Sequence, residues 1–172
     1  SGLAYMHSIK MQHRDLKPDN VIFDAVGRPK IIDLGLATMA NSKSRVSTRA
    51  AGAVGTNLYT SPEKGSGQSY GPEDAVWALG CMLVGGVQGT LMEDMDLHAV
   101  GIIALNPPEI ERLVAAAKAK SARLGALAGT MLSQDAARRP KARHVEAKLL
   151  ATGAEAARIH ELEEQLAAAE AA

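Results

Sequence analysis

The chain of 172 residues carries 19 Lys and Arg against 19 Asp and Glu, a balance that favours neither nucleic acid nor an anionic membrane as a partner. Hydrophobic residues make up 47% of the chain and aromatics only 3%, which predicts a mainly helical, lightly packed core within one domain. No apolar run is long enough to span a bilayer, and a single cysteine, Cys81, excludes an internal disulfide, so we expect a cytoplasmic protein.

The first predicted element is an amphipathic helix over residues 1 to about 11. The chain has no initiator Met and opens within this helix, so we expect it to be part of a longer protein. A proline disfavours the helical conformation in the residue before it, and Pro18 follows Lys17. Residues 13–18 are therefore predicted to form a loop.

Two short apolar runs, residues 21–24 and 29–33, flank a turn that contains Gly27. Glycine adopts the positive φ angles that such turns need, so this stretch is predicted to form a β-hairpin. Residues 36 to about 73 show no sustained periodicity and are rich in Ser, Thr, Gly and Asn. So long a stretch is either a functional loop or disordered.

The remaining predicted elements are helices. Residues 75–87 are apolar all round, which indicates a helix buried within the domain that ends near Gly85–Gly86. Residues 107–132 read as helices with proline at a helix start, and residues from 142 to the end read as helical. The fold class predicted from these elements is mainly α, with a small β-hairpin beside the first loop.

Four polar residues around the loop and the hairpin could carry chemistry. Asp15 and Lys17 lie in the loop, Asn20 comes just before the first predicted strand, and Asp33 closes the second. Asn20 and Asp33 would supply the few oxygen ligands that Mg²⁺ accepts when phosphates and water complete its shell. Asp15 can accept a proton from a hydroxyl, and Lys17 can neutralise charge on a phosphoryl group. Together they are the parts of phosphoryl transfer.

Five motifs occur in the order and approximate spacing seen in eukaryotic protein kinases. The chain resembles the large C-terminal lobe of a serine/threonine protein kinase over residues 1 to about 150, and residues 151–172 are predicted to form a separate Ala/Glu-rich helix. The motifs that carry the resemblance are HRDLKPDN, DLGLA, GTNLYTSPE, VWALGCML and DAARRP.

The resemblance implies ATP and Mg²⁺ as cofactors and a protein Ser or Thr hydroxyl as substrate. Asp15 matches the catalytic base, and Lys17 matches the lysine that contacts the γ-phosphate of ATP. Asn20 and Asp33 match the Mg²⁺ ligands. Thr56 matches the threonine that orders the base and the lysine.

The resemblance also implies a regulatory loop from Leu36 to about Thr60. Arg14, beside the base, would pair with a phosphate on that loop, because arginine binds phosphate through two parallel hydrogen bonds. An ordinary solvated hydroxyl is the alternative for each candidate acceptor. The candidates are Ser42, Ser44, Ser47 and Thr48.

Several other residues match structural positions of the family. His13 is expected to pack beside the DLG motif, where Leu34 would fill an internal slot. Glu63 and Arg139 are expected to form a buried ion pair, and Trp77 is expected to anchor the core.

Two departures from the family bear on activity. The acidic residue that usually stands two positions before the tryptophan is replaced by Ala75, and Asp74 stands one step earlier, which rotates a helical side chain by about 100°. The sequence also contains no Gly-rich phosphate loop and none of the other parts of the small N-terminal lobe. The isolated chain is therefore expected to be inactive unless that lobe or a partner chain completes it in trans. A pseudokinase-like interaction module is the alternative function.

The Ala/Glu-rich end of the chain has apolar residues at alternating spacings of three and four. Such a seam is typical of a coiled coil but extends over only about two heptads, so self-association and a terminal helix that packs on its own lobe both remain open. The seam comprises Ile159, Leu162, Leu166 and Ala169.

Overall fold

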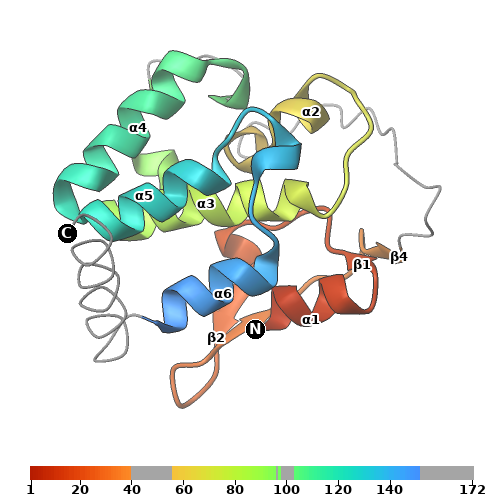
Figure 1. The fold of residues 1–172 in the computed structure, drawn as a ribbon. Helices are drawn as coiled ribbons and strands as arrows, with labels where there is room; N and C mark the ends of the chain where they lie inside the picture. Colours follow the sequence, from red (N-terminus) through yellow and green to blue (C-terminus); the bar gives the residue numbers. More distant parts are fainter. Residues whose placement is uncertain (40–55, 96, 98–102, 152–172) are drawn as a thin grey trace, which may run out of the picture.

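The computed structural model describes residues 1–39, 56–95, 97 and 103–151 (Figure 1). The four candidate phosphate acceptors, Ser42, Ser44, Ser47 and Thr48, lie outside the described residues, and so does the predicted coiled-coil seam.

Helices dominate the described residues, together with two small antiparallel sheets. The α-helices are α1 (Gly2–Ser8), α2 (Pro62–Gly65), α3 (Glu73–Gln88), α4 (Pro107–Lys120), α5 (Ala122–Met131) and α6 (Ala142–Leu150). The 3₁₀ turns are η1 (Pro18–Asn20), η2 (Thr56–Tyr59), η3 (Met92–Asp94), η4 (Ile103–Leu105) and η5 (Ala136–Arg138). The strands are β1 (Met11–Gln12), β2 (Val21–Phe23), β3 (Pro29–Ile31) and β4 (Thr38–Met39). The mainly helical class predicted from the sequence is confirmed.

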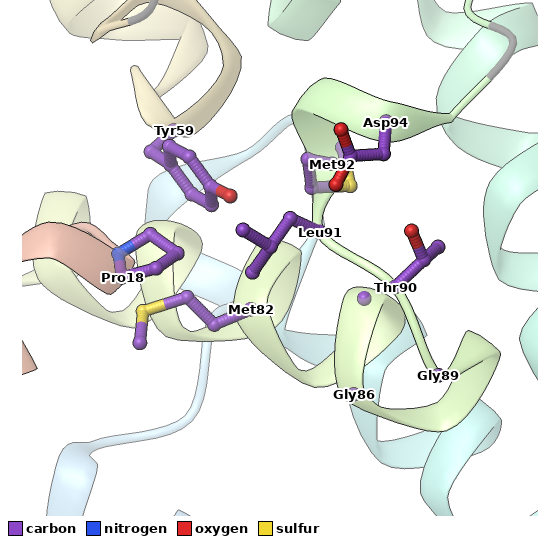
Figure 2. Close-up of a pocket in the computed structure, with 10 residues that line it drawn as sticks. Pro18, Tyr59, Met82, Gly86, Gly89, Thr90, Leu91, Met92 and Asp94 are labelled. Atoms are coloured by element: carbon purple, nitrogen blue, oxygen red, sulfur yellow. The ribbon is translucent and has the colours of Figure 1, made fainter.

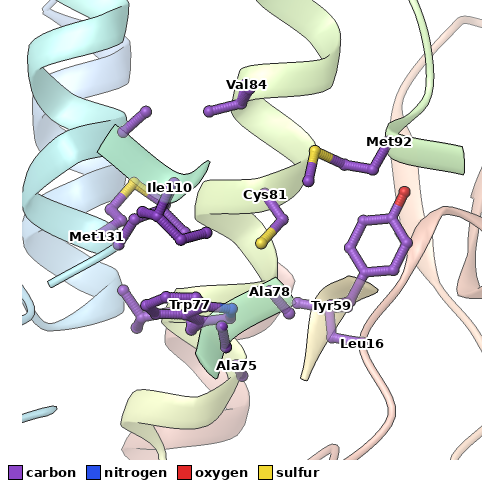
Figure 3. Packing of buried hydrophobic residues seen from close by; sticks show 14 of the residues in the cluster. Leu16, Tyr59, Ala75, Trp77, Ala78, Cys81, Val84, Met92, Ile110 and Met131 are labelled. Atoms are coloured by element: carbon purple, nitrogen blue, oxygen red, sulfur yellow. The ribbon is translucent and has the colours of Figure 1, made fainter. Parts of the chain in front are cut away.

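The long helix α3 runs through the centre of the molecule and packs against α4 and α5 (Figure 1). Trp77, Cys81 and Val84 are fully buried on it, and Figure 3 shows Ile110 of α4 and Met131 of α5 in the same cluster. A helix that is apolar all round needs an apolar environment, which the core of the protein supplies here.

The predicted end of α3 was wrong. Gly85 and Gly86 lie inside the helix, and Gly89, with φ 77°, ends it through a hydrogen bond from its amide to the carbonyl of Gly85 at 2.9 Å. Left-handed caps of this kind favour glycine. Gly85 serves packing instead, because a Cβ there would lie 2.8 Å from the carbonyl oxygen of Thr90.

The predicted helices of residues 107–132 are α4 and α5, which join at Ser121. The Ser121 hydroxyl accepts a hydrogen bond from the Leu124 amide at 3.3 Å and so caps the start of α5. The two helices lie so close together at Gly125 that a Cβ there would collide with the backbone of Lys118.

The first helix is shorter than predicted. It ends at Ser8, and Lys10 turns the chain with φ 59°, so Met11 belongs to β1 and not to the helix. Strand β1 pairs with β4, with Met11 opposite Met39 and Gln12 opposite Thr38. The pairing of β1 with β4 therefore encloses residues 13–37, which carry the loop and the hairpin.

The predicted β-hairpin is present. Strands β2 and β3 pair antiparallel, with Val21 opposite Ile31 and Phe23 opposite Pro29. Gly27 has φ 77°, as the turn requires. The hairpin lies next to the loop that carries the candidate catalytic residues.

Candidate active site

The loop after β1 and the η1 turn that follows it bring three of the four predicted catalytic side chains into direct contact. The Lys17 ammonium lies 3.2 Å from Asp15 Oδ2, and the Asn20 side-chain amide donates to the same oxygen at 3.3 Å. Asn20 also donates to the Asp15 carbonyl at 2.7 Å. The side chains of Asp15 and Lys17 remain about one fifth exposed (19% and 24%), so the cluster is in contact with solvent.

His13 anchors this loop on the hairpin. Its ring is fully buried, Nδ1 accepts a hydrogen bond from the Asp15 amide at 3.3 Å, and Nε2 lies 2.9 Å from the Ile32 carbonyl oxygen. Because Nδ1 accepts, Nε2 carries the proton and donates to Ile32. The histidine therefore connects the backbone of the loop to the residue that precedes Asp33.

Asp33 joins the site through the backbone. The Ile32 amide donates to the Asn20 carbonyl at 2.9 Å, so the chain immediately before Asp33 is bonded to both His13 and Asn20. Asp33 has φ 58°, and its Oδ1 accepts from the Gly35 amide at 3.1 Å. Its carboxylate is exposed.

Asn20 and Asp33 fit a magnesium ion that keeps much of its shell from water and phosphate. The Asn20 amide nitrogen is turned toward Asp15, so its Oδ1 is the atom that could bind a cation. The exposed carboxylate of Asp33 is the kind of oxygen ligand that Mg²⁺ accepts. In the described part of the chain, no three His, Cys, Asp or Glu side chains are grouped to hold a metal by themselves.

Two other predicted positions differ from expectation or are only partly described. Leu34 does not fill an internal slot, since it is 51% exposed. It opens a turn in which its carbonyl accepts from the Ala37 amide at 2.9 Å, right after the left-handed Asp33, and this turn directs it outward. Thr56 begins η2, and its side chain lies outside the description.

Glu63 and Arg139 form a buried ion pair. The guanidinium makes two bonds of 2.7 Å to the carboxylate, is fully buried, and lies 5.0 Å from the ring centroid of Trp77. Burial alone would raise the pKa of Glu63, but hydrogen bonding and the charge of Arg139 outweigh it, so the pKa lies below its ordinary value. The pair connects α2 to the segment before α6.

Asp74 and Lys64 form a second buried pair, which the sequence analysis did not predict. The Lys64 ammonium lies 3.3 Å from Asp74 Oδ2 and donates to the Arg14 carbonyl at 2.5 Å. Burial raises the pKa of Asp74, while Lys64 and the Ser61 hydroxyl oppose that shift. A lysine just after the motif glutamate gives no sequence signal of its own, because its partners come from other segments.

Arg14 was expected to bind a phosphate on the regulatory loop. In the structure its φ is 72°, and its Nε donates to the Tyr70 hydroxyl at 3.1 Å. The residues that would carry the phosphate lie outside the described chain, so that role stays a prediction.

A cavity of about 510 Å³ opens beside the site (Figure 2). Its lining includes Pro18 of η1, Tyr59 of η2, Met82 of α3, and Leu91 and Met92. The Tyr59 hydroxyl donates to Glu93 at 2.8 Å, and burial together with that carboxylate raises the pKa of the phenol.

None of the helices in the described ranges is both long and apolar enough to cross a membrane.

Comparison with known proteins gives consistent matches. The family model described as protein kinase domain matches residues 1–149. The chain is 36% identical over 114 residues to the probable serine/threonine-protein kinase PkwA of Thermomonospora curvata. This match covers 65% of this chain and 15% of that protein. It is 32% identical over 108 residues to the serine/threonine-protein kinase STE20 of Saccharomyces cerevisiae, which covers 62% of this chain and 11% of that protein.

A solved structure, the yeast RNA Pol II CTD kinase CTDK-1 complex, is similar with a TM-score of 0.67 and 23% identity. That match covers 84% of this chain and 56% of the other, and at this identity it shows the fold alone. The chain thus spans only a small part of the curated relatives that it matches.

Proposed function

This chain belongs to the protein kinase domain family, and from that premise we propose that it carries the catalytic residues of a serine/threonine protein kinase. The reaction transfers the γ-phosphoryl group of ATP to the hydroxyl of a protein Ser or Thr, inside the cell. Two relatives that are named as serine/threonine-protein kinases support the class of substrate. The contact of Asp15 with both Lys17 and Asn20 is the observation that carries the proposal.

In the proposed mechanism Asp15 accepts the hydroxyl proton as the substrate oxygen attacks the γ-phosphorus. The bond from that phosphorus to the β–γ bridging oxygen breaks, and ADP leaves. Asn20 holds the Asp15 carboxylate in place, and the Lys17 ammonium, 3.2 Å from that carboxylate, neutralises charge on the transferred group. Positioning and charge neutralisation supply most of the catalysis in reactions of this class.

Magnesium belongs to the same proposal. Asn20 and Asp33 would hold the ion, which would neutralise charge on the phosphates of ATP. The chain's own part is to keep these two residues in register, and it does so through the bond between the Ile32 amide and the Asn20 carbonyl.

The 172 residues alone are proposed to be inactive. Their sequence contains no Gly-rich loop and no lysine–glutamate pair to form the opposite wall of an ATP site. The surface of the hairpin suits a covering lobe or partner chain, since Ile22, Phe23 and Val26 are 49%, 69% and 72% exposed. Ile22 and Phe23 are consecutive on β2, so their side chains point to opposite faces of the hairpin, and a covering lobe or partner chain could use either face.

The test replaces the matching segment of the Thermomonospora curvata relative with residues 1–149 and measures transfer of labelled phosphate to a library of Ser/Thr peptides. We expect activity from the chimera, and a loss of about 10²–10⁴-fold with Asp15→Asn, because the general base is removed. Asp19→Asn is the matched control, as Asp19 is an exposed aspartate in the adjoining η1 turn. Equal activity of the two variants would refute the role of Asp15.

A second candidate function is a binding module without catalysis. The exposed apolar hairpin favours it, because a partner could dock there whether or not phosphate is transferred. Binding of a fluorescent ATP analogue to the chimera distinguishes the two functions, since a kinase binds it in the presence of Mg²⁺ and a pure interaction module does not.

A further inference from the structure

Ala75 leaves the catalytic loop without the acidic side chain that the sequence analysis expected two positions before Trp77. Both Ala75 and Asp74 are nevertheless buried, at 5% exposed each. A carboxylate inside a protein needs a partner, because burial without one is strongly unfavourable. The partners of Asp74 therefore show which contacts the carboxylate makes from a position one residue before the usual one.

Asp74 faces the segment around α2. Its Oδ1 accepts from the Ser61 hydroxyl at 2.8 Å, and its Oδ2 lies 3.3 Å from the Lys64 ammonium. The side chains of Asp74 and Lys64 are only 8% and 11% exposed. The buried carboxylate thus fixes the position of a buried ammonium.

That ammonium reaches the catalytic loop. Lys64 Nζ donates to the backbone carbonyl of Arg14 at 2.5 Å, and Arg14 directly precedes Asp15. Arg14 has φ 72°, a conformation that a residue with a side chain adopts at a cost and that surrounding contacts must maintain. The Arg14 side chain is held as well, because Nε donates to the hydroxyl of Tyr70 at 3.1 Å, and the Lys64 ammonium lies 5.3 Å from the ring centroid of that tyrosine.

We infer that Lys64 is a positioning residue for the proposed catalytic base: the pair of Lys64 and Asp74 holds the Arg14 carbonyl, and through it the orientation of Asp15. The lysine bridges the loop carbonyl and a carboxylate that stands one helical position before the usual acidic residue. This inference deepens the proposed function and rests on it for its catalytic meaning, while the contact itself can be tested on the chain alone.

Hydrogen exchange of backbone amides tests the contact in the 172-residue chain. The probes are the Asp15 and Ile32 amides, which donate to His13 and Asn20, and the amides of α5 report global opening. With Lys64→Met we expect the probe amides to exchange about tenfold faster or more, relative to those of α5, since the loop loses its anchor.

Two further variants separate positioning from general stability. Lys64→Arg retains a cation with several donors, so it should restore most of the protection of the probe amides. Lys120→Met is the matched control, because Lys120 also donates to a backbone carbonyl, that of Gln88 at 2.9 Å, away from the site. It should leave the ratio of loop exchange to α5 exchange unchanged.

Unchanged exchange at Asp15 and Ile32 in Lys64→Met, or an equal acceleration in the loop and in α5, would overturn the inference. If the chimera with residues 1–149 transfers no phosphate while Lys64→Met loosens the loop selectively, the proposed function fails and the positioning contact stands. If the chimera is active, its kcat with Lys64→Met should fall more than its KM changes.

Discussion

Replacement of Arg139 by methionine should destabilise the protein far more than the same change at its neighbour Arg138. Arg139 is fully buried and makes four bonds: two to Glu63 at 2.7 Å, one to the Ser133 carbonyl at 2.9 Å and one to the Glu73 carbonyl at 3.1 Å. Arg138 instead pairs with Asp135 at 3.5 Å, with both side chains mostly exposed.

The expected magnitudes follow from burial. Removal of one partner from a buried ion pair leaves the other charge uncompensated and costs about 3–5 kcal/mol, and we expect a value in this range for Arg139→Met. An exposed pair contributes about 1 kcal/mol or less, which bounds the effect of Arg138→Met. Glu63→Gln keeps the shape and part of the hydrogen bonding, so about 1–3 kcal/mol is expected for it.

Urea unfolding followed by tryptophan fluorescence measures these free energies. Trp77 is the only tryptophan, is fully buried and lies against the Arg139 guanidinium, so its emission reports the relevant part of the core. A double variant, Glu63→Gln with Arg139→Met, should lose less than the sum of the two single variants, because both break the same interaction. Equal losses for Arg139→Met and Arg138→Met would refute the reasoning.

Three other predictions follow from single features. The fold lowers the pKa of Glu63 from 4.5, so the ionised carboxylate stabilises the folded protein above pH 4.5, and this stabilisation is lost as the pH falls through the lowered pKa. The difference in unfolding free energy between wild type and Glu63→Gln should therefore shrink as the pH falls from 6 to 3. A constant difference would contradict this. Burial raises the pKa of the Cys81 thiol to about 12, so a disulfide reagent at pH 8 should label it only in urea; rapid labelling of the folded protein would show that the thiol is accessible. Gly125→Ala should destabilise the protein by about 1–3 kcal/mol because its Cβ meets the backbone of α4, whereas Gly86→Ala, where a Cβ meets open space, should stabilise it by up to about 1 kcal/mol in the same urea assay; the reverse order would contradict the packing.

Local patterns in the sequence predicted local structure well. The hairpin was predicted from two apolar runs and Gly27, and the central helix from its uniformly apolar residues; both are present. The end of α3 was missed because Gly85 reads as a helix terminator, although its lack of a side chain is needed for contact with Thr90. That contact depends on where the chain returns after the helix, and no local pattern contains this.

In the candidate site, too, contacts between residues close in sequence were predicted and contacts between distant segments were missed. Asp15, Lys17 and Asn20 are close in sequence, so one loop brings them together. Lys64 was missed because its importance depends on Asp74 and Arg14, which are separated from it by the fold. Leu34 was expected to be internal by likeness to a family position, but a residue is buried only where neighbouring segments cover it, and in the described residues none does.

The pairing of β1 with β4 has a consequence for how the region could vary. Because Met11 lies opposite Met39, the chain between them is a long loop whose two ends are held together by the β1–β4 pairing. The entropy of closing such a loop grows only with the logarithm of its length, at about 0.6 kcal/mol per doubling. Residues inserted at the tip around Gly27 would lengthen only the turn that the β2–β3 pairing closes at Phe23 and Pro29, so both pairings could stay in place and this tip is where the region can accept new sequence.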